Sequence, residues 1–363
     1  MTPRMWRPAL AGPALAMAMI ATGASAQGRF TNARTETRSA AQGVEREVRA
    51  IAARGGAAWV GYRVPMIDGP RQMCCYDTIS DGIVIGGGTC RLESGGGVSM
   101  TTGDVAQRGS RIVLEPPTEF VVLARVERGA VERVRTFTPD CDVDAGGMPI
   151  VWLSDVRPDD SIAWLTTLVL AGEEKLAKSA MHAVAMHDAP AADGALESFV
   201  APARPEWLRS DTSFWLGNAR GASGARVLAR MIANDPSDKV RERVTFGLSQ
   251  SKERAALATL LATAKSDRST KVRGQALFWL AQKAGREAVA AISGAIENDP
   301  DTEVKKKAVF ALSQLPQDEG VPKLIEIART NKNPEVRKQA IFWLGQSHDA
   351  RAAQFFEDIL LRK

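Results

Sequence analysis

The four cysteines carry the most evident chemistry in this chain, and they lie in one region of its N-terminal half. They are Cys74, Cys75, Cys90 and Cys141. An even number of cysteines confined to one region favours disulfide bonds. Because a bridge between adjacent residues is geometrically awkward, we expect Cys74 and Cys75 to pair separately, each with Cys90 or Cys141. The alternative is a redox switch or soft-metal site at Cys74-Cys75, but the chain has no C-x-x-C motif and no histidine nearby.

Acidic residues alternate along the segment that contains Cys141. Asp140, Asp142 and Asp144 precede two glycines and resemble the beginning of a calcium-binding loop. An EF-hand loop requires a glutamate at its twelfth position, where this chain has Val151. We therefore interpret the segment as an acidic turn held by a disulfide.

Histidine, a common general base and metal ligand, is scarce. The chain has His182, His187 and His348, and His182 occupies a position where later repeats have phenylalanine. The motifs of phosphate-binding loops, nucleophile elbows and zinc proteases are missing. The sequence therefore offers no catalytic residue, and we predict no metal site and no cofactor.

Residues 1–26 have the three parts of a cleavable secretory signal peptide. Arg4 and Arg7 form a basic start, residues 9–20 are apolar, and Ala24-Ser25-Ala26 supplies an A-x-A cleavage site. No later segment approaches 18 consecutive apolar residues, so we expect no transmembrane helix. Removing the peptide lowers the formal charge from +5 to +3, which argues against nucleic-acid binding. We expect a periplasmic or secreted bacterial protein.

The part that follows the signal peptide changes from a helical to a strand pattern. Residues 27–56 form a segment that ends in an amphipathic helix, with Val44, Val48 and Ile51 on its apolar face. Residues 57–156 predict a small β-rich, disulfide-containing domain. Its expected strands lie at 58–64, 82–85 and 111–114, in a hairpin at 119–138 with a tight turn at Arg128-Gly129, and at 149–153.

The C-terminal half of the chain repeats one pattern every 32 residues. A fixed period of this length is the signature of a repeat array, and we expect about six repeats. The clearest copies share a basic residue, a phenylalanine, a leucine and a glutamine: Arg241, Phe246, Leu248, Gln250; Arg273, Phe278, Leu280, Gln282; Lys305, Phe310, Leu312, Gln314; and Arg337, Phe342, Leu344, Gln346.

Each repeat contains two helical patterns. The first is apolar on most of its circumference, which indicates a helix packed between neighbours, and the second has the three-four spacing of an amphipathic helix. Antiparallel helical pairs stacked on one another form an α-solenoid. The pattern resembles HEAT repeats, particularly the short phycobilisome-lyase-like type, over residues 174–363. The expected architecture is α+β and multidomain, with an all-α solenoid at 157–363 that begins with a bridging helix.

The resemblance does not bring a catalytic activity with it. Some HEAT-repeat proteins are di-iron hydroxylases whose ligands are paired His-Glu steps on successive repeats, and this sequence has no His-Glu step. Bilin lyase activity is likewise supported by no residue of the chain.

Two rows of charged residues run along the repeats. One is basic and the other, six residues earlier in each repeat, is mostly acidic. A basic row could bind phosphates or acidic polymers. We favour a structural ladder in which each acidic residue caps a helix and pairs with a neighbouring cation, as in HEAT repeats generally. The rows are Arg209, Arg241, Arg273, Lys305 and Arg337, and Asp235, Asp267, Asp299 and Asn331.

The leading functional hypothesis is an exported, non-catalytic scaffold whose solenoid binds a partner protein or peptide in the cell envelope. Its candidate contacts are polar residues of the second helices, and Trp215, Trp279 and Trp343 are interpreted as core, with groove lining as the alternative. The rival hypothesis is an enzyme or a ligand- or metal-binding protein with a site near Tyr62, Cys74, Cys75, Asp140 and Asp142. A structural role in the envelope is a third. The candidate contacts are Lys265, Glu297, Lys323, Glu326 and Arg329.

Overall fold

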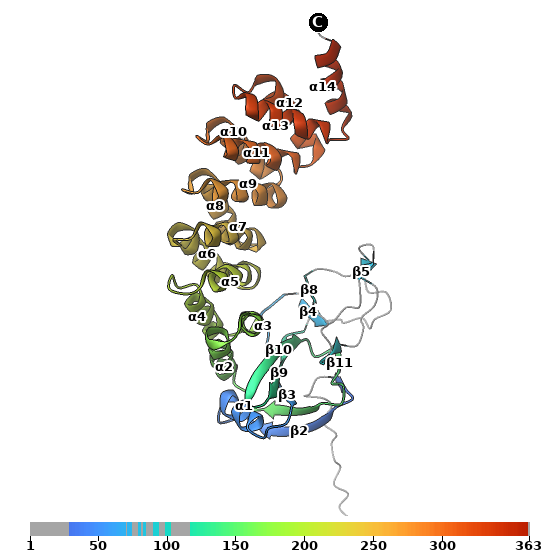
Figure 1. Cartoon of the computed structure of the whole chain (residues 1–363), viewed down its shortest axis with the longest axis vertical. Helices are drawn as coiled ribbons and strands as arrows, with labels where there is room; N and C mark the ends of the chain where they lie inside the picture. Colours follow the sequence, from blue (N-terminus) through green and yellow to red (C-terminus); the bar gives the residue numbers. More distant parts are fainter. Residues whose placement is uncertain are drawn as a thin grey trace, which may run out of the picture.

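The computed structural model describes residues 29–69, 71–74, 79–80, 83–84, 90–93, 99–102 and 117–361. The described chain consists of a β-sheet domain and an elongated array of paired helices that leads away from it (Figure 1). The architecture is therefore α+β, with a C-terminal helical solenoid. The predicted signal peptide, Cys75 and the strand expected at 111–114 lie outside the described residues.

A five-stranded sheet forms the centre of the β-sheet domain. Its order is β10-β9-β3-β12-β2, in which β12 is parallel to β3 and β2, while β3, β9 and β10 are antiparallel. The predicted hairpin is confirmed, and its turn residues Arg128 and Gly129 have φ of 52° and 81°, as a two-residue type I′ turn requires. The strands of this sheet are β2 (Arg34–Ser39), β3 (Ala58–Pro65), β9 (Glu119–Glu127), β10 (Ala130–Phe137) and β12 (Pro149–Ser154).

The remaining strands are short. They form a parallel sheet β1-β11-β7 and two antiparallel pairs, β4-β8 and β5-β6. Their bounds are β1 (Arg29–Thr31), β4 (Arg71–Cys74), β5 (Ile79–Ser80), β6 (Ile83–Val84), β7 (Cys90–Arg91), β8 (Ser99–Thr102) and β11 (Asp142–Asp144).

The sequence does not predict β1 or β2, although β2 pairs along its whole length with β12. Strand β2 lies at the edge of the large sheet and most of its residues are exposed. An exposed edge strand needs no alternation of apolar and polar residues, and charged side chains are common there. Arg34–Ser39 therefore looks like a polar linker in the sequence.

The two faces of the large sheet are covered by different layers. On one face, Val60, Tyr62 and Val122 belong to a core that includes helix α1 (Val44–Ala52) and continues into the solenoid. On the other face, Trp59 and Trp152 pack in a second core with residues of β7 and β11. The sheet thus separates the cysteine-bearing layer from the helices.

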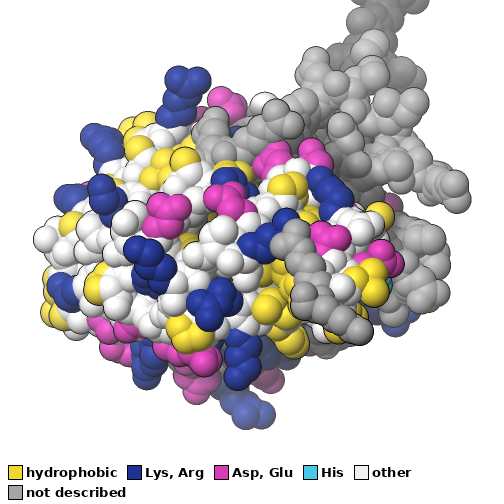
Figure 2. All heavy atoms as spheres, turned by 90° about the horizontal axis from the view of Figure 1, so that it is seen from above, with side chains coloured by type: hydrophobic (Ala, Val, Ile, Leu, Met, Phe, Trp, Pro, Cys, Tyr) yellow, Lys and Arg dark blue, Asp and Glu magenta, His cyan; other side chains and the backbone are white. Residues whose placement is uncertain are grey.

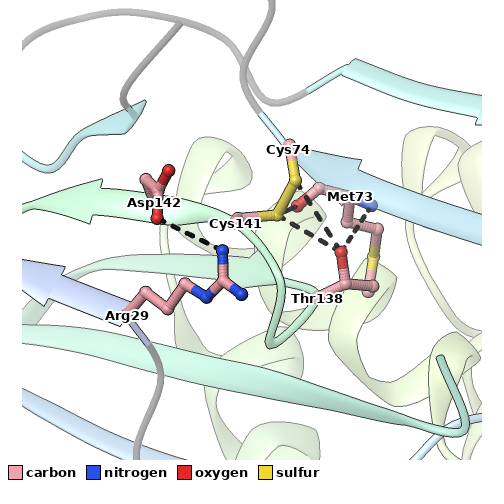
Figure 3. The surroundings of a disulfide bond; sticks show 6 residues. All are labelled: Arg29, Met73, Cys74, Thr138, Cys141 and Asp142. Carbon is pink, nitrogen blue, oxygen red and sulfur yellow. Dashed lines mark hydrogen bonds and ion pairs between the residues drawn. A yellow bond between two sulfur atoms is a disulfide. The ribbon is translucent and has the colours of Figure 1, made fainter. Parts of the chain in front are cut away.

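A disulfide joins Cys74 at the end of β4 to Cys141 just before β11, with Cα atoms 5.4 Å apart (Figure 3). Beside it, Thr138 N donates to Met73 O and Met73 N donates to Thr138 Oγ1, both at 3.2 Å. Cys90 is disulfide-bonded as well. The expectation that Cys74 pairs with Cys90 or Cys141, and not with its neighbour Cys75, is confirmed.

Removal of this disulfide is expected to lower the free energy of unfolding of the β-sheet domain by about 2–5 kcal/mol. The bridge joins residues 67 positions apart, so its loss returns considerable conformational entropy to the unfolded chain. Urea unfolding of a Cys74→Ala/Cys141→Ala variant, followed by near-ultraviolet circular dichroism, measures the change against oxidised wild type. An unchanged unfolding midpoint would contradict the expectation.

Six helical pairs follow the bridging helix α2 (Pro158–Ala171), in agreement with the predicted number of repeats. The pairs are α3 (Glu174–Met186) with α4 (Pro190–Phe199), α5 (Glu206–Ala219) with α6 (Gly221–Asn234), α7 (Asp238–Gln250) with α8 (Arg254–Ser266), α9 (Thr270–Ala284) with α10 (Arg286–Asn298), α11 (Thr302–Ser313) with α12 (Gln317–Thr330), and α13 (Pro334–Gly345) with α14 (Ala350–Leu361). Among the described helices, none combines the length and apolar character needed to cross a membrane.

The first helices of successive pairs pack side by side, and α5 and α7 approach most tightly at two glycines. A Cβ atom added to Gly217 would lie 1.9 Å from Gly247 O, and one added to Gly247 would lie 2.3 Å from Ser213 O. Both positions therefore require glycine at this junction.

The β-sheet domain meets the solenoid at a buried polar junction. Met66 and His187 form an isolated antiparallel bridge. Ser161 Oγ, on α2, lies 2.8 Å from Tyr62 OH and 2.9 Å from His187 Nε2. His187 is fully buried, and this burial lowers its pKa to about 4. A strand, the bridging helix and the first repeat are thus joined by hydrogen bonds among fully buried side chains.

Candidate partner-binding site

The charged rows of the repeats form ion pairs between successive repeats. The guanidinium groups of Arg209, Arg241 and Arg273 each hold a carboxylate through two N–H···O bonds of 2.7–3.2 Å. Each pair joins the first helix of one repeat to the turn before the first helix of the next. The paired side chains are at most 10% exposed, so these arginines are not available to bind phosphate groups. The acidic partners are Asp235, Asp267 and Asp299.

We expected these aspartates to cap helices. Their side chains do not cap the first helices. Each accepts a backbone N–H from two residues further along the chain, at 2.8–2.9 Å, and so shapes the turn. The side chains that cap helices are Ser237, Asp301 and Asn333, which come after the turn. Each carboxylate thus accepts hydrogen bonds both from the backbone of its own turn and from the arginine of the preceding repeat.

The ladder ends at the junction between the last two repeats, where Lys305 and Asn331 replace arginine and aspartate. Lys305 Nζ donates instead to Glu297 O at 2.9 Å. Asn331 Oδ1 keeps the turn bond to Asn333 N, at 2.9 Å. A lysine cannot form the forked pair of hydrogen bonds that a guanidinium makes, and an amide carries no charge to hold it.

A polar pocket of about 430 Å³ lies at this interruption, between α10 and α12. Its lining carries charges of both signs together with hydroxyl and amide groups. Of the five candidate contact residues, the structure brings Glu297, Lys323 and Glu326 together here. The lining is Ser293, Ile296, Glu297, Lys305, Lys323, Glu326, Ile327, Thr330, Asn331, Lys332 and Asn333.

The two other candidate contacts lie outside this pocket. Lys265 is exposed near the end of α8. Arg329 is exposed on α12 and donates to Asp358 of α14, at 2.9 Å. The sequence reveals the departure at Lys305 and Asn331, but it does not show that a pocket opens there.

A row of aromatic rings along the first helices was not anticipated from the sequence. Trp215, Trp279 and Trp343 are each partly exposed and lie on a ring of the preceding repeat, with centroids 4.6–5.0 Å apart. A tryptophan in every second repeat alternates with Ala183, Gly247 or Ala311 at the equivalent position. This two-repeat period of 64 residues is the signal that could have predicted the row. Its members are His182, Phe214, Trp215, Phe246, Phe278, Trp279, Phe310, Phe342 and Trp343.

The β-sheet domain does not gather the residues of the rival site. Tyr62 is fully buried on the helical face of the large sheet, where burial raises the pKa of its hydroxyl, whereas Cys141 lies on the opposite face. Among the described residues, Cys74, Asp140 and Cys141 are close enough to hold a metal ion. The two sulfur atoms are joined to each other, which removes them as thiolate ligands.

The acidic turn has partners for its carboxylates. Asp144 Oδ1 accepts hydrogen bonds from Gly146 N at 2.8 Å and from Asn32 Nδ2 at 3.0 Å. These bonds lower the pKa of Asp144, first through the Gly146 N–H and then through Asn32. Asp142 lies 3.7 Å from Arg29 (Figure 3).

The family model of HEAT repeats matches the chain twice, over residues 257–331 and 289–363. Residues 257–363, the last part of the solenoid, are HEAT repeats. The match covers helices α8 to α14. The 32-residue period and the ion-pair ladder continue in the same register in the repeats before it. The HEAT-repeat fold is typically that of a scaffold for protein interaction. No curated protein sequence matches this chain.

Several solved structures are similar to this chain at low identity. Human deoxyhypusine hydroxylase is 16% identical, with 56% of this chain and 80% of that chain covered and a TM-score of 0.31. The CpcE–CpcF complex of phycocyanin lyase from Nostoc sp. is 18% identical, with 42% and 97% covered and a TM-score of 0.33. Kap95p, in a complex with RanGDP, is 15% identical, with 53% and 30% covered and a TM-score of 0.35.

Proposed function

We propose that this protein is an exported, non-catalytic scaffold that binds a partner protein or peptide in the cell envelope through the last repeats of its HEAT solenoid. The observation that carries the proposal is the interrupted ladder. Three successive junctions use the same buried arginine–aspartate pair, and the next junction, where the pair is lost, has a pocket of about 430 Å³.

The chemistry of this pocket suits a peptide segment. Lys305 and Lys332 can meet carboxylates, and Glu297 can meet basic side chains or backbone N–H groups. Lys323 and Glu326 form an ion pair with each other at 2.7 Å. Figure 2, seen from the C-terminal end of the solenoid, shows basic, acidic and hydrophobic side chains interspersed on that face. A surface of mixed charge favours a specific protein partner over a uniformly charged polymer.

The location in the envelope rests on the sequence of residues 1–26. A basic start, an apolar stretch and an A-x-A site together direct export and are removed from the mature protein. Fractionation of cells that produce the full chain, with amino-terminal sequencing of the exported form, tests this part. Recovery of the uncleaved chain in the cytoplasm would contradict it.

Rebuilding the ladder is expected to weaken partner binding. A Lys305→Arg/Asn331→Asp variant places an arginine–aspartate pair at this junction, as in the three junctions before it, and it removes Lys305 and Asn331 from the pocket lining. We expect this variant to lose at least tenfold in affinity, about 1.4 kcal/mol, for a partner captured from envelope extract with the mature wild-type protein.

Two comparisons make this result interpretable. The rebuilt ladder should leave the solenoid folded and no less stable, so lost capture cannot come from unfolding. Lys239→Ala, an exposed change on α7 away from the pocket, should leave capture unchanged. Full-strength capture by the rebuilt variant would exclude this pocket as the binding site.

A further inference from the structure

Two repeats contain an internal cation that caps a helix C-terminus of the preceding repeat. Arg220 Nη1 donates to Ala185 O at 3.3 Å and to His187 O at 2.8 Å, at the end of α3. Lys283 Nζ donates to Ser249 O at 2.7 Å and to Ser251 O, at the end of α7. In both cases the cation follows the tryptophan of its own repeat, Trp215 or Trp279, by four or five residues.

The physical reason for these contacts is the same in both repeats. The last carbonyl groups of a helix receive no hydrogen bond from an N–H group of the same helix, and the helix dipole places partial negative charge there. A lysine or arginine side chain satisfies two such carbonyls and is stabilised by the dipole. The carbonyls used are separated by two residues in each case, so the two sites share one geometry.

The last repeat, which contains Trp343, lies against carbonyl groups at the equivalent positions, but the described part of it has no lysine or arginine that caps them. Counting 64 residues from the α7 site places Ser313 O and Leu315 O at the end of α11, with Ser347 in the position of Lys283. Ser347 Oγ accepts a hydrogen bond from Asp349 N instead. Among the described residues, no side-chain cation donates to either carbonyl.

A cavity of about 220 Å³ lies where the cation would be. Its lining includes the carbonyl-bearing residues Ser313 and Leu315, together with Trp343, Gln346, Ser347 and His348. Trp343 Nε1 is buried and has no hydrogen-bond partner, like Trp279 Nε1 at the equivalent place. Near the rim, Arg351 donates to Gln317 O at 3.0 Å and is paired with Asp349.

We propose that this cavity binds a basic side chain of the partner, a lysine ammonium or an arginine guanidinium, in the place that Lys283 and Arg220 occupy within the chain. The carbonyls of Ser313 and Leu315 accept its N–H groups, and the Trp343 ring lies beside it as an aromatic wall that favours a cation. The identity of the ligand as part of a protein rests on the proposed function, whereas the cation site itself does not.

The test uses the mature full-length protein and small organic cations. Butylammonium and butylguanidinium are titrated while the indole N–H resonances of the tryptophans are followed by nuclear magnetic resonance, with Trp343 assigned through a Trp343→Phe variant. We expect the Trp343 resonance to shift with the cations in the millimolar range and not with the neutral analogue butanol. The cation with the higher affinity shows whether the site prefers a lysine or an arginine side chain.

Two substitutions exchange the residues at the equivalent positions 283 and 347. Ser347→Lys supplies the missing internal cation, so it should remove the response of Trp343. Lys283→Ser should open an equivalent cavity at α7 and make the Trp279 resonance respond to the same cations. A response to butanol equal to that of butylammonium, or an undiminished response in Ser347→Lys, would overturn the proposal.

Failure here and failure of the proposed function are distinguishable. If the cations bind nowhere while envelope capture remains sensitive to Lys305→Arg/Asn331→Asp, then the cation site is wrong and the scaffold function stands. If the cations bind and no partner is captured, then the site is real and its ligand is not a protein.

Discussion

Replacing Arg241 by alanine is expected to lower the free energy of unfolding of the solenoid by about 3–5 kcal/mol. The Arg241 side chain is 1% exposed, and it donates to both carboxylate oxygens of Asp267 at 3.0 and 3.2 Å. Its removal leaves a nearly buried carboxylate without its main partner. It also leaves Asp235 O, which Arg241 Nη1 binds at 2.8 Å, without this donor.

Arg337→Ala provides the matched control, because Arg337 occupies the equivalent position in the last repeat. It donates to Asn331 O at 2.8 Å, as Arg241 donates to Asp235 O. The sequence position 26 residues further along, which supplies the carboxylate partner Asp267 to Arg241, is Lys363 for Arg337. We expect a loss of about 1 kcal/mol from this variant. Urea unfolding followed by circular dichroism at 222 nm compares the two. Equal effects would show that the carbonyl contact, and not the ion pair, holds the repeats together.

Stability is also expected to fall by about 3 kcal/mol as the pH decreases from about 6.5 to about 4, because of His187 alone. Burial lowers the pKa of His187 to about 4, whereas the unfolded chain has the ordinary value of 6.5. Between these two values the unfolded state binds a proton that the folded state does not. The contribution is therefore complete above pH 6.5, decreases through this interval, and changes no further below pH 4.

His187→Gln is the control for this pH dependence. Glutamine does not titrate, and it retains groups that can bond Ser161 Oγ and Ala183 O, the partners of the two imidazole nitrogen atoms. Unfolding free energies of wild type and variant, measured at half-unit steps from pH 4 to pH 7.5, should converge at low pH and diverge at high pH. Parallel curves would show that His187 does not titrate in this range.

The solenoid could be predicted from the sequence because its information is local and repeated. The basic residue, Phe246 and Leu248 recur at a constant spacing, and helical periodicity identifies which faces are buried. The hairpin β9–β10 and helix α1 were predictable for the same reason, since their patterns are short-range. Strand β2 was missed because an edge strand with exposed polar residues carries no such pattern.

The candidate sites were only partly predictable. The sequence shows that Lys305 and Asn331 differ from the arginine and aspartate of the other repeats. Whether a pocket forms there depends on the direction of the Lys305 side chain, which donates to Glu297 O. The caps of Arg220 and Lys283 reach carbonyls more than 30 residues away in the chain. Such contacts depend on the packing of one repeat on the next.

By itself, therefore, the amino-acid sequence determined the repeat unit, its number of copies and the cysteine-rich β-sheet region, because these follow from residue type and spacing. Only the tertiary structure decided which copies are complete. Stacking brings the side chains of one repeat onto the backbone of its neighbour, so an exchange such as Lys283 for Ser347 becomes a filled or an open site only in three dimensions.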